Sequence, residues 1–138
     1  MGSRMSDREE RLRPIVDRYR NAKFEWGVHD CALFAARCFD VQLGTNFESR
    51  ILALNYHSSL SALRIIEREG GWEAFITRMI GRPPVESSGL VFGDAVLGRA
   101  NGPLALGICD DDYFMAPAEQ GLAWLPMSRA IKGWPCRR

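Results

Sequence analysis

The residues with the most reactive chemistry in this 138-residue chain lie in one short segment, where Trp26-Gly27-Val28 leads into His29, Asp30 and Cys31. Apolar residues at helical spacing start directly after it, so Cys31 is expected in the first turn of a helix. Backbone N–H groups at a helix N-terminus carry partial positive charge, which stabilises a thiolate and lowers the pKa of a cysteine. Cys31 is therefore a candidate nucleophile, and it would need a general base within hydrogen-bond reach.

His29 is a weak candidate for that base. It lies two residues before Cys31, and the loop would have to fold back sharply to bring its imidazole to the thiol. The alternative is that His29 stabilises the turn before the helix. Asp30 is expected to be the N-cap, with its carboxylate accepting helix N–H groups and orienting its neighbours. His57, the other histidine, is expected at the start of a later helix and not in a catalytic role.

The composition excludes several classes of function. A net charge of +1 provides no electrostatic attraction for nucleic acid, and no apolar run approaches the ~20 residues of a membrane span. The two histidines and four cysteines lack zinc-ligand spacing, so we expect no metal and no cofactor. The charged N-terminus has no signal-peptide core, which favours a reduced, cytosolic protein. Cys136, in a tail that ends with two arginines, is expected to be exposed.

Residue periodicity predicts a helical first half and a β-rich second half, and hence an α+β fold. Residues 1–5 are expected to be a tag or disordered start, and 6–138 one domain. Helices are predicted at about 6–22, 30–43, 47–54, from Ser58 or Ser59 to Gly70, and 72–80, and Gly44 is expected to be the C-cap of the second. Strands are predicted at 95–98, 104–109, 113–116 and 121–125, followed by a last short helix from Pro126 to about Trp134. Asn101-Gly102 is expected to form the hairpin turn between the first two strands.

Three motifs in this order resemble the NlpC-type branch of the papain-like cysteine peptidases. They are Asp30-Cys31 at the helix start, Gly93-Asp94 before the first core strand, and the strand Ala105-Leu106-Gly107-Ile108. The resemblance is greatest to small domains of this type encoded among the tail genes of long-tailed bacteriophages. It implies N-terminal helices packed on a small antiparallel sheet, with Cys31 at the nucleophile position.

The sequence departs from this family at the catalytic base. The family carries its histidine where this chain has Ala105, and the polar group that orients the histidine would fall near Ala116. Without a base, an ordinary thiol is only slightly ionised at neutral pH, and nothing protonates the leaving amine. The resemblance therefore favours a degenerate site and a structural or assembly protein of the phage tail tip. Such a protein would bind other tail proteins, first in the bacterial cytoplasm and then in the virion tail.

Two other hypotheses stay open. The chain could be an active cysteine peptidase or amidase that cleaves peptidoglycan stem peptides through Cys31, with His29 or a partner chain supplying the base. It could also be a cytosolic regulatory binding protein. Trp26 and Asp94 are candidate binding residues. Trp26 alternatively is a core anchor like the other tryptophans, and Asp94 a residue that closes a turn or pairs with an arginine.

Overall fold

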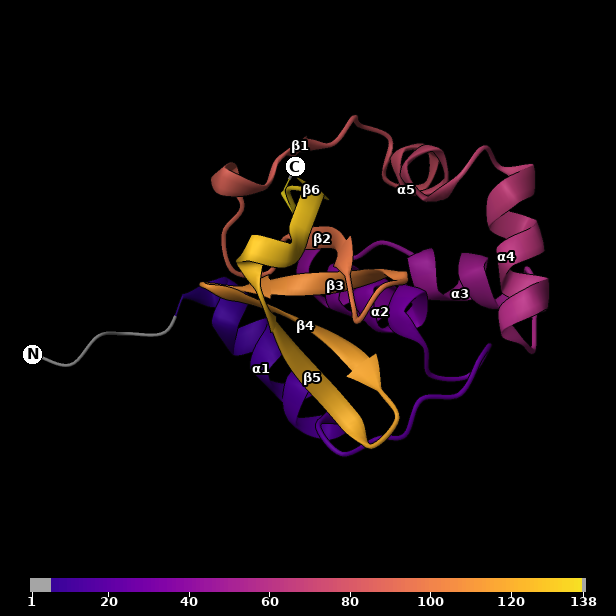
Figure 1. Cartoon of the computed structure of the whole chain (residues 1–138). Helices are drawn as coiled ribbons and strands as arrows, with labels where there is room; N and C mark the ends of the chain where they lie inside the picture. The colour runs from indigo at the N-terminus through magenta and orange to yellow at the C-terminus, as the bar shows by residue number, and fades with distance from the viewer. Residues whose placement is uncertain (1–5, 138) are drawn as a thin grey trace, which may run out of the picture.

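The computed structural model describes residues 6–137, so the expected tag or disordered start at 1–5 lies outside the described residues. Helices form the first half of this described chain and strands the second, which confirms the α+β prediction (Figure 1). The helices are α1 (Asp7–Tyr19), α2 (Cys31–Leu43), α3 (Phe47–Leu52), α4 (Ser59–Arg68) and α5 (Trp72–Ile80). The strands are β1 (Val85–Glu86), β2 (Ala95–Arg99), β3 (Leu104–Asp110), β4 (Tyr113–Ala118), β5 (Gly121–Pro126) and β6 (Ala130–Trp134).

Helix α2 is the central helix, and its two caps are the ones that the sequence predicts. Asp30 is the N-cap, and Gly44 ends the helix in the left-handed conformation with φ of 71°. Nearly all of its circumference is buried, because α1 and α3 flank it and β3 and β4 pack against it (Figure 1). Burial on all sides explains why its apolar residues do not form a single stripe.

The strands form one antiparallel sheet in the order β1-β6-β2-β3-β4-β5. The predicted last helix from Pro126 to Trp134 is wrong. Only Met127–Arg129 forms a 3₁₀ turn, and the chain then continues as β6, which pairs with both β1 and β2. These partners lie more than 30 residues earlier in the chain, so local periodicity carries no signal for the pairing.

The C-terminal segment is held in the core, and the expectation that Cys136 is exposed is wrong. Its side chain is buried, and its backbone N–H donates to Asp94 Oδ1 at 2.8 Å. Burial raises the pKa of the Cys136 thiol to about 12. The pairing of β6 with β2 directs the chain into the core, which explains the burial of a cysteine next to charged residues.

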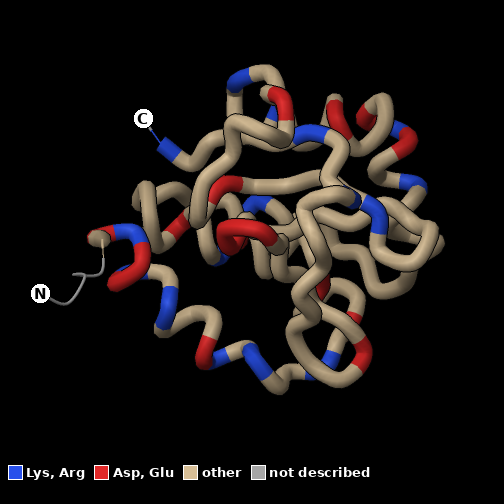
Figure 2. The backbone as a smooth tube through the Cα atoms, turned by 60° about the vertical axis from the view of Figure 1, so that its left-hand side comes forward, with Lys and Arg blue, Asp and Glu red and all other residues tan. Residues whose placement is uncertain are grey.

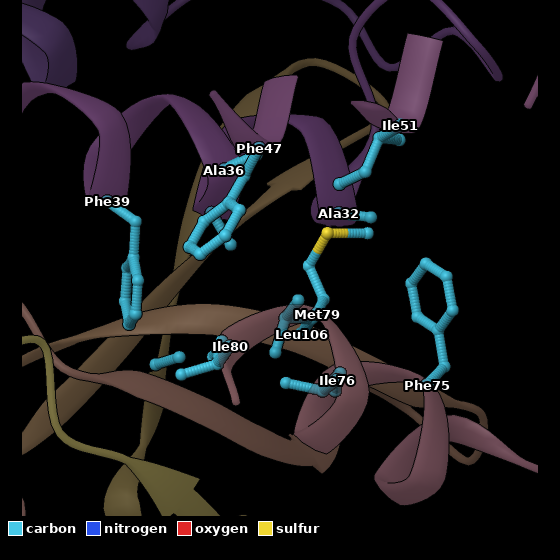
Figure 3. Close-up of a pocket in the computed structure, with 12 residues that line it drawn as sticks. Ala32, Ala36, Phe39, Phe47, Ile51, Phe75, Ile76, Met79, Ile80 and Leu106 are labelled. Atoms are coloured by element: carbon cyan, nitrogen blue, oxygen red, sulfur yellow. The ribbon is translucent and has the colours of Figure 1, made fainter. Parts of the chain in front are cut away.

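The core between α2, α3, α5 and the sheet contains a small apolar cavity, which Figure 3 shows in close-up. Its walls include Ala32, Ala36 and Phe39 of α2, opposite Ile76 of α5 and Leu106 of β3. Its volume is about 30 Å³, and cavities of that size with apolar walls hold no ligand larger than a water molecule. This cavity is a narrow apolar crevice that is partly open to solvent.

Acidic and basic residues are mixed over the described chain and alternate along α1 (Figure 2). Arg13 pairs with Glu9 on α1, and Arg20, the residue after α1, pairs with Asp17. Pairs of this kind are typical of a solvated helix face. Among residues 6–137, no helix is long and apolar enough to cross a membrane.

Candidate functional site

Cys31 lies at the first position of α2, beneath a cover of aromatic side chains. Trp26, Tyr56, Trp72 and Phe75 line a cavity of about 30 Å³ beside it. Its own side chain is 7% exposed. Because a cavity of this size admits a water molecule and not a peptide, the thiol is closed to a substrate in this conformation.

The environment of the Cys31 thiol opposes ionisation. Burial is the main cause that raises its pKa to about 11, and the negative charge of Asp30 acts in the same direction. The backbone N–H groups of Leu106, Ala32 and Cys31 act in the opposite direction, but burial outweighs them. The helix N-terminus alone would lower the pKa, so the observed direction is the reverse of what an activated nucleophile needs.

Asp30 caps α2 as predicted and also holds the preceding loop in place. Its Oδ1 accepts the N–H of Leu33 at 3.0 Å, and its Oδ2 accepts the N–H of Gly27 at 2.9 Å. The Tyr56 hydroxyl donates to the same Oδ2 at 2.6 Å, and burial together with this bond raises the pKa of Tyr56. None of these bonds goes to His29, so Asp30 stabilises the loop and caps the helix and does not orient the His29 ring.

Glycine is required at position 27 of this loop. Gly27 adopts φ of +78°, and a Cβ atom there would collide with the carbonyl oxygen of Tyr56. Both the left-handed conformation and the close approach exclude other residue types. The turn therefore fixes Tyr56 against the start of α2.

His29 is held away from a catalytic role by its own contacts. Its ring stacks on Tyr19 with the centroids 4.7 Å apart, and its Nδ1 lies 3.0 Å from Arg37 Nη1. Because the guanidinium can only donate, Nδ1 is the acceptor and Nε2 carries the proton. Burial and the charge of Arg37 lower the pKa of His29, and its buried Nε2 has no hydrogen-bond partner among residues 6–137. A neutral imidazole whose acceptor nitrogen is already occupied cannot take a proton from Cys31.

The backbone of His29 has the alternative role that the sequence suggests. Its N–H donates to the carbonyl of Glu25 at 2.8 Å, and its own carbonyl accepts the Glu25 N–H at 2.9 Å. These two bonds close the turn that contains Trp26 and Gly27. His29 therefore stabilises the turn before α2.

No base lies on β3 next to Cys31, whose nearest β3 neighbour is the backbone of Leu106. Leu104, Leu106 and Ile108 share the face that packs against α2 and belong to the same core cluster as Cys31. The one acidic residue on this face, Asp110, is the last residue of the strand and is bound to Arg13 and to the indole N–H of Trp124. Ala105 alternates with these residues and shares the opposite face with Gly107 and Cys109. Since Ala105 and its neighbours are all apolar, a shift of the strand by one residue would not bring a proton acceptor to the thiol.

Asp94 lies in a different network, at the other end of α2. Its Oδ1 accepts from Arg8 Nη2 at 2.8 Å, and its Oδ2 accepts the N–H of Val91 at 2.9 Å. The predicted roles in closing a turn and pairing with an arginine are both confirmed. Gln42, which binds Arg8 and Gly93, anchors this network to α2. Gln42 is eleven residues after Cys31, or about 16 Å along the helix. Asp94, which lies at the Gln42 end of α2, is therefore too far from the Cys31 thiol to contact it.

Trp26 does lie beside Cys31, and it also lines a larger apolar groove of about 350 Å³. Trp72 is the second tryptophan in both places, and Leu63, Pro103 and Leu104 complete the groove wall. The sequence distributes the tryptophans over separate elements, and only the fold brings these two together. By contrast, Trp134 is fully buried, as a core anchor should be.

Sequence reasoning missed Tyr56 and the backbone of Leu106 as neighbours of the thiol. Tyr56 lies between two helices in a segment without periodicity, so nothing in the pattern marks it. A polar-aromatic residue that is buried in a loop must find a hydrogen-bond partner, and that rule is the only available signal. Within residues 6–137, no group of three or more histidine, cysteine, aspartate or glutamate side chains could hold a metal ion.

Comparison with known proteins identifies a family for the chain but assigns it no activity. No curated protein matches the chain. A family model described as a domain of unknown function, DUF6950, matches residues 3–136, which is nearly the whole sequence. The chain therefore belongs to the DUF6950 family.

Proposed function

We propose that this protein is a structural or assembly component of a bacteriophage tail tip, built on an NlpC-like papain fold whose catalytic site is degenerate. The observation that carries the proposal is the state of Cys31. The thiol is buried, its pKa is raised to about 11, and Leu104, Leu106 and Ile108, the β3 residues that share its core cluster, are apolar. A thiol in this state is a poor nucleophile at neutral pH.

The order of the structural elements supports the NlpC-like part of the proposal. A cysteine opens the central helix, Asp94 precedes the first long strand, and the Ala105–Ile108 segment lies in the next strand. The antiparallel sheet follows the helices in the chain, as the resemblance implies. The family match itself carries no activity, so these positions and the motifs are what connect the chain to that fold.

The exposed apolar side chains near Cys31 support a binding role. Leu60 and Leu63 of α4 are 56% and 49% exposed, and Leu63 lines the groove beside Trp26 and Trp72. Exposed apolar surface next to a closed thiol suits contact with another protein better than turnover of a substrate. The partners that we propose are other tail or tail-tip proteins.

Replacing Cys31 by alanine tests the proposal. In a phage that encodes this chain, Cys31→Ala particles should contain the protein at the wild-type copy number and remain infectious. Mass spectrometry of purified tails and plaque counts provide the measurement. The matched control is Cys109→Ala, which removes another buried thiol whose pKa is also raised to about 11.

The competing hypothesis, a peptidoglycan peptidase or amidase, predicts a different result for the same pair of variants. Purified wild-type protein would then release stem-peptide fragments from cell walls, and Cys31→Ala would abolish the release while Cys109→Ala would not. That outcome would reject the degenerate site. It would also require a base other than His29, because the acceptor nitrogen of His29 is bonded to Arg37.

A further inference from the structure

Another hollow, of about 410 Å³, lies where the β2–β3 hairpin meets the start of β6. It shares no lining residue with the Cys31 cavity or with the groove beside Trp26 and Trp72. Its polar side chains are Arg99, Asn101, Ser128 and Arg129. A hollow of this volume falls in the range of small-molecule sites, which begins at about 300 Å³.

The hollow is cationic. Among the described residues, two arginines line it and no carboxylate does. Within residues 6–137 neither Arg99 nor Arg129 forms an ion pair, whereas Arg8, Arg13 and Arg37 are each paired with an acidic side chain. Two unneutralised guanidinium groups at one concavity repel each other, and an anion between them would remove that cost.

The same hairpin loop holds both guanidinium groups. Arg99 Nη1 donates to the carbonyl oxygen of Gly102 at 2.9 Å, and Arg129 Nη1 lies 3.4 Å from Asn101 Oδ1. Each guanidinium has five N–H donors and uses one of them in these contacts. The remaining donors, with the Ser128 hydroxyl, are available to oxygen acceptors. Anchoring each side chain by one nitrogen lowers the entropy cost of binding with the others.

We propose that this hollow binds a phosphate dianion, as inorganic phosphate or as the terminal phosphate of a monoester. Two positive charges match a dianion, and the planar guanidinium fork matches the oxygen spacing of a phosphate. A phosphodiester carries a single charge and is the weaker match. This difference also separates the site from a nucleic-acid surface, which would use many more cationic contacts.

Titration of the full chain with inorganic phosphate at pH 8 and constant ionic strength tests the proposal. Amide chemical shifts near Arg99 and Arg129 should move and saturate at one phosphate per chain. The double variant Arg99→Gln/Arg129→Gln should weaken binding by roughly tenfold or more, because each lost charge-assisted contact contributes on that order. The matched control is Arg64→Gln/Arg68→Gln, which changes the net charge equally on exposed α4 and should bind as the wild type does.

Two further arms test the chemistry of the site. Methyl phosphate should bind like inorganic phosphate, and dimethyl phosphate, a monoanion, should bind more weakly. Arg99→Lys/Arg129→Lys keeps both charges and removes the fork, and it should also weaken binding. Shifts that never saturate, an equal loss in the α4 control, equal affinity for dimethyl phosphate, or full affinity in the lysine variant would each overturn the proposal.

Discussion

Replacing Trp134 by alanine is expected to lower the free energy of unfolding by about 3–5 kcal/mol. Trp134 is the last residue of β6, is fully buried, and pairs with Ala95 of β2. Its indole Nε1 donates to Thr77 Oγ1 of α5 at 3.2 Å, so one side chain joins the sheet to a helix. The substitution leaves a large cavity and an unpaired hydroxyl, and chemical denaturation measures the loss.

The matched control for Trp134→Ala lies on the same strand. Ile131 is 42% exposed, and Ile131→Ala should change the free energy of unfolding by less than about 1 kcal/mol. If the two variants lose similar stability, β6 does not close the core in the way described.

Replacing Asp30 by alanine is expected to cost about 3 kcal/mol or more in the free energy of unfolding. Loss of the cap on α2 contributes about 1 kcal/mol. The buried Tyr56 hydroxyl loses its acceptor, and the N–H of Gly27 does as well, at about 1–3 kcal/mol for each unsatisfied group. Thermal or chemical denaturation at pH 7 measures the sum.

Two controls separate the cap from the wider network of Asp30. Ser58 is the N-cap of α4 in an exposed position, so Ser58→Ala should cost only about 1 kcal/mol. Tyr56→Phe removes one bond of the network and keeps the ring, and it should fall between the other two variants. If Asp30→Ala costs no more than Ser58→Ala, then Asp30 acts only as a cap.

Local patterns predict the helices of this chain well. Asp30 and Gly44 bound α2 as expected, and α5 spans the predicted residues 72–80. The turn at Asn101-Gly102 also forms, with both residues at positive φ. Caps, turn residues and periodicity act within a few residues of each other, so a sequence displays them directly.

The features that the sequence does not predict depend on contacts between distant segments. β6 forms because β2 offers it a paired edge, and the burial of Cys136 follows from that pairing. The raised pKa of Cys31 also depends on contacts between distant segments. The helix N-terminus is visible in the sequence, whereas the cover supplied by Trp26, Tyr56 and Trp72 appears only when three separate segments meet.

The alkylation rate of Cys31 as a function of pH distinguishes a buried, protonated thiol from an activated nucleophile. Peptide-resolved mass spectrometry after iodoacetamide treatment follows each cysteine in the wild-type chain, with Cys109 as the internal control. Only the thiolate reacts, so a pKa raised from 9 to about 11 makes the ionised fraction at pH 7 about 100-fold smaller.

Cys31 in the folded protein should react much more slowly at pH 7 than in the denatured chain, and its rate should rise until about pH 11. Cys109 should follow the same profile, because burial raises its pKa to about 11 as well. Fast labelling of Cys31 in the folded protein at pH 7, with a midpoint below that of the denatured chain and with Cys109 still slow, would instead identify Cys31 as an activated nucleophile.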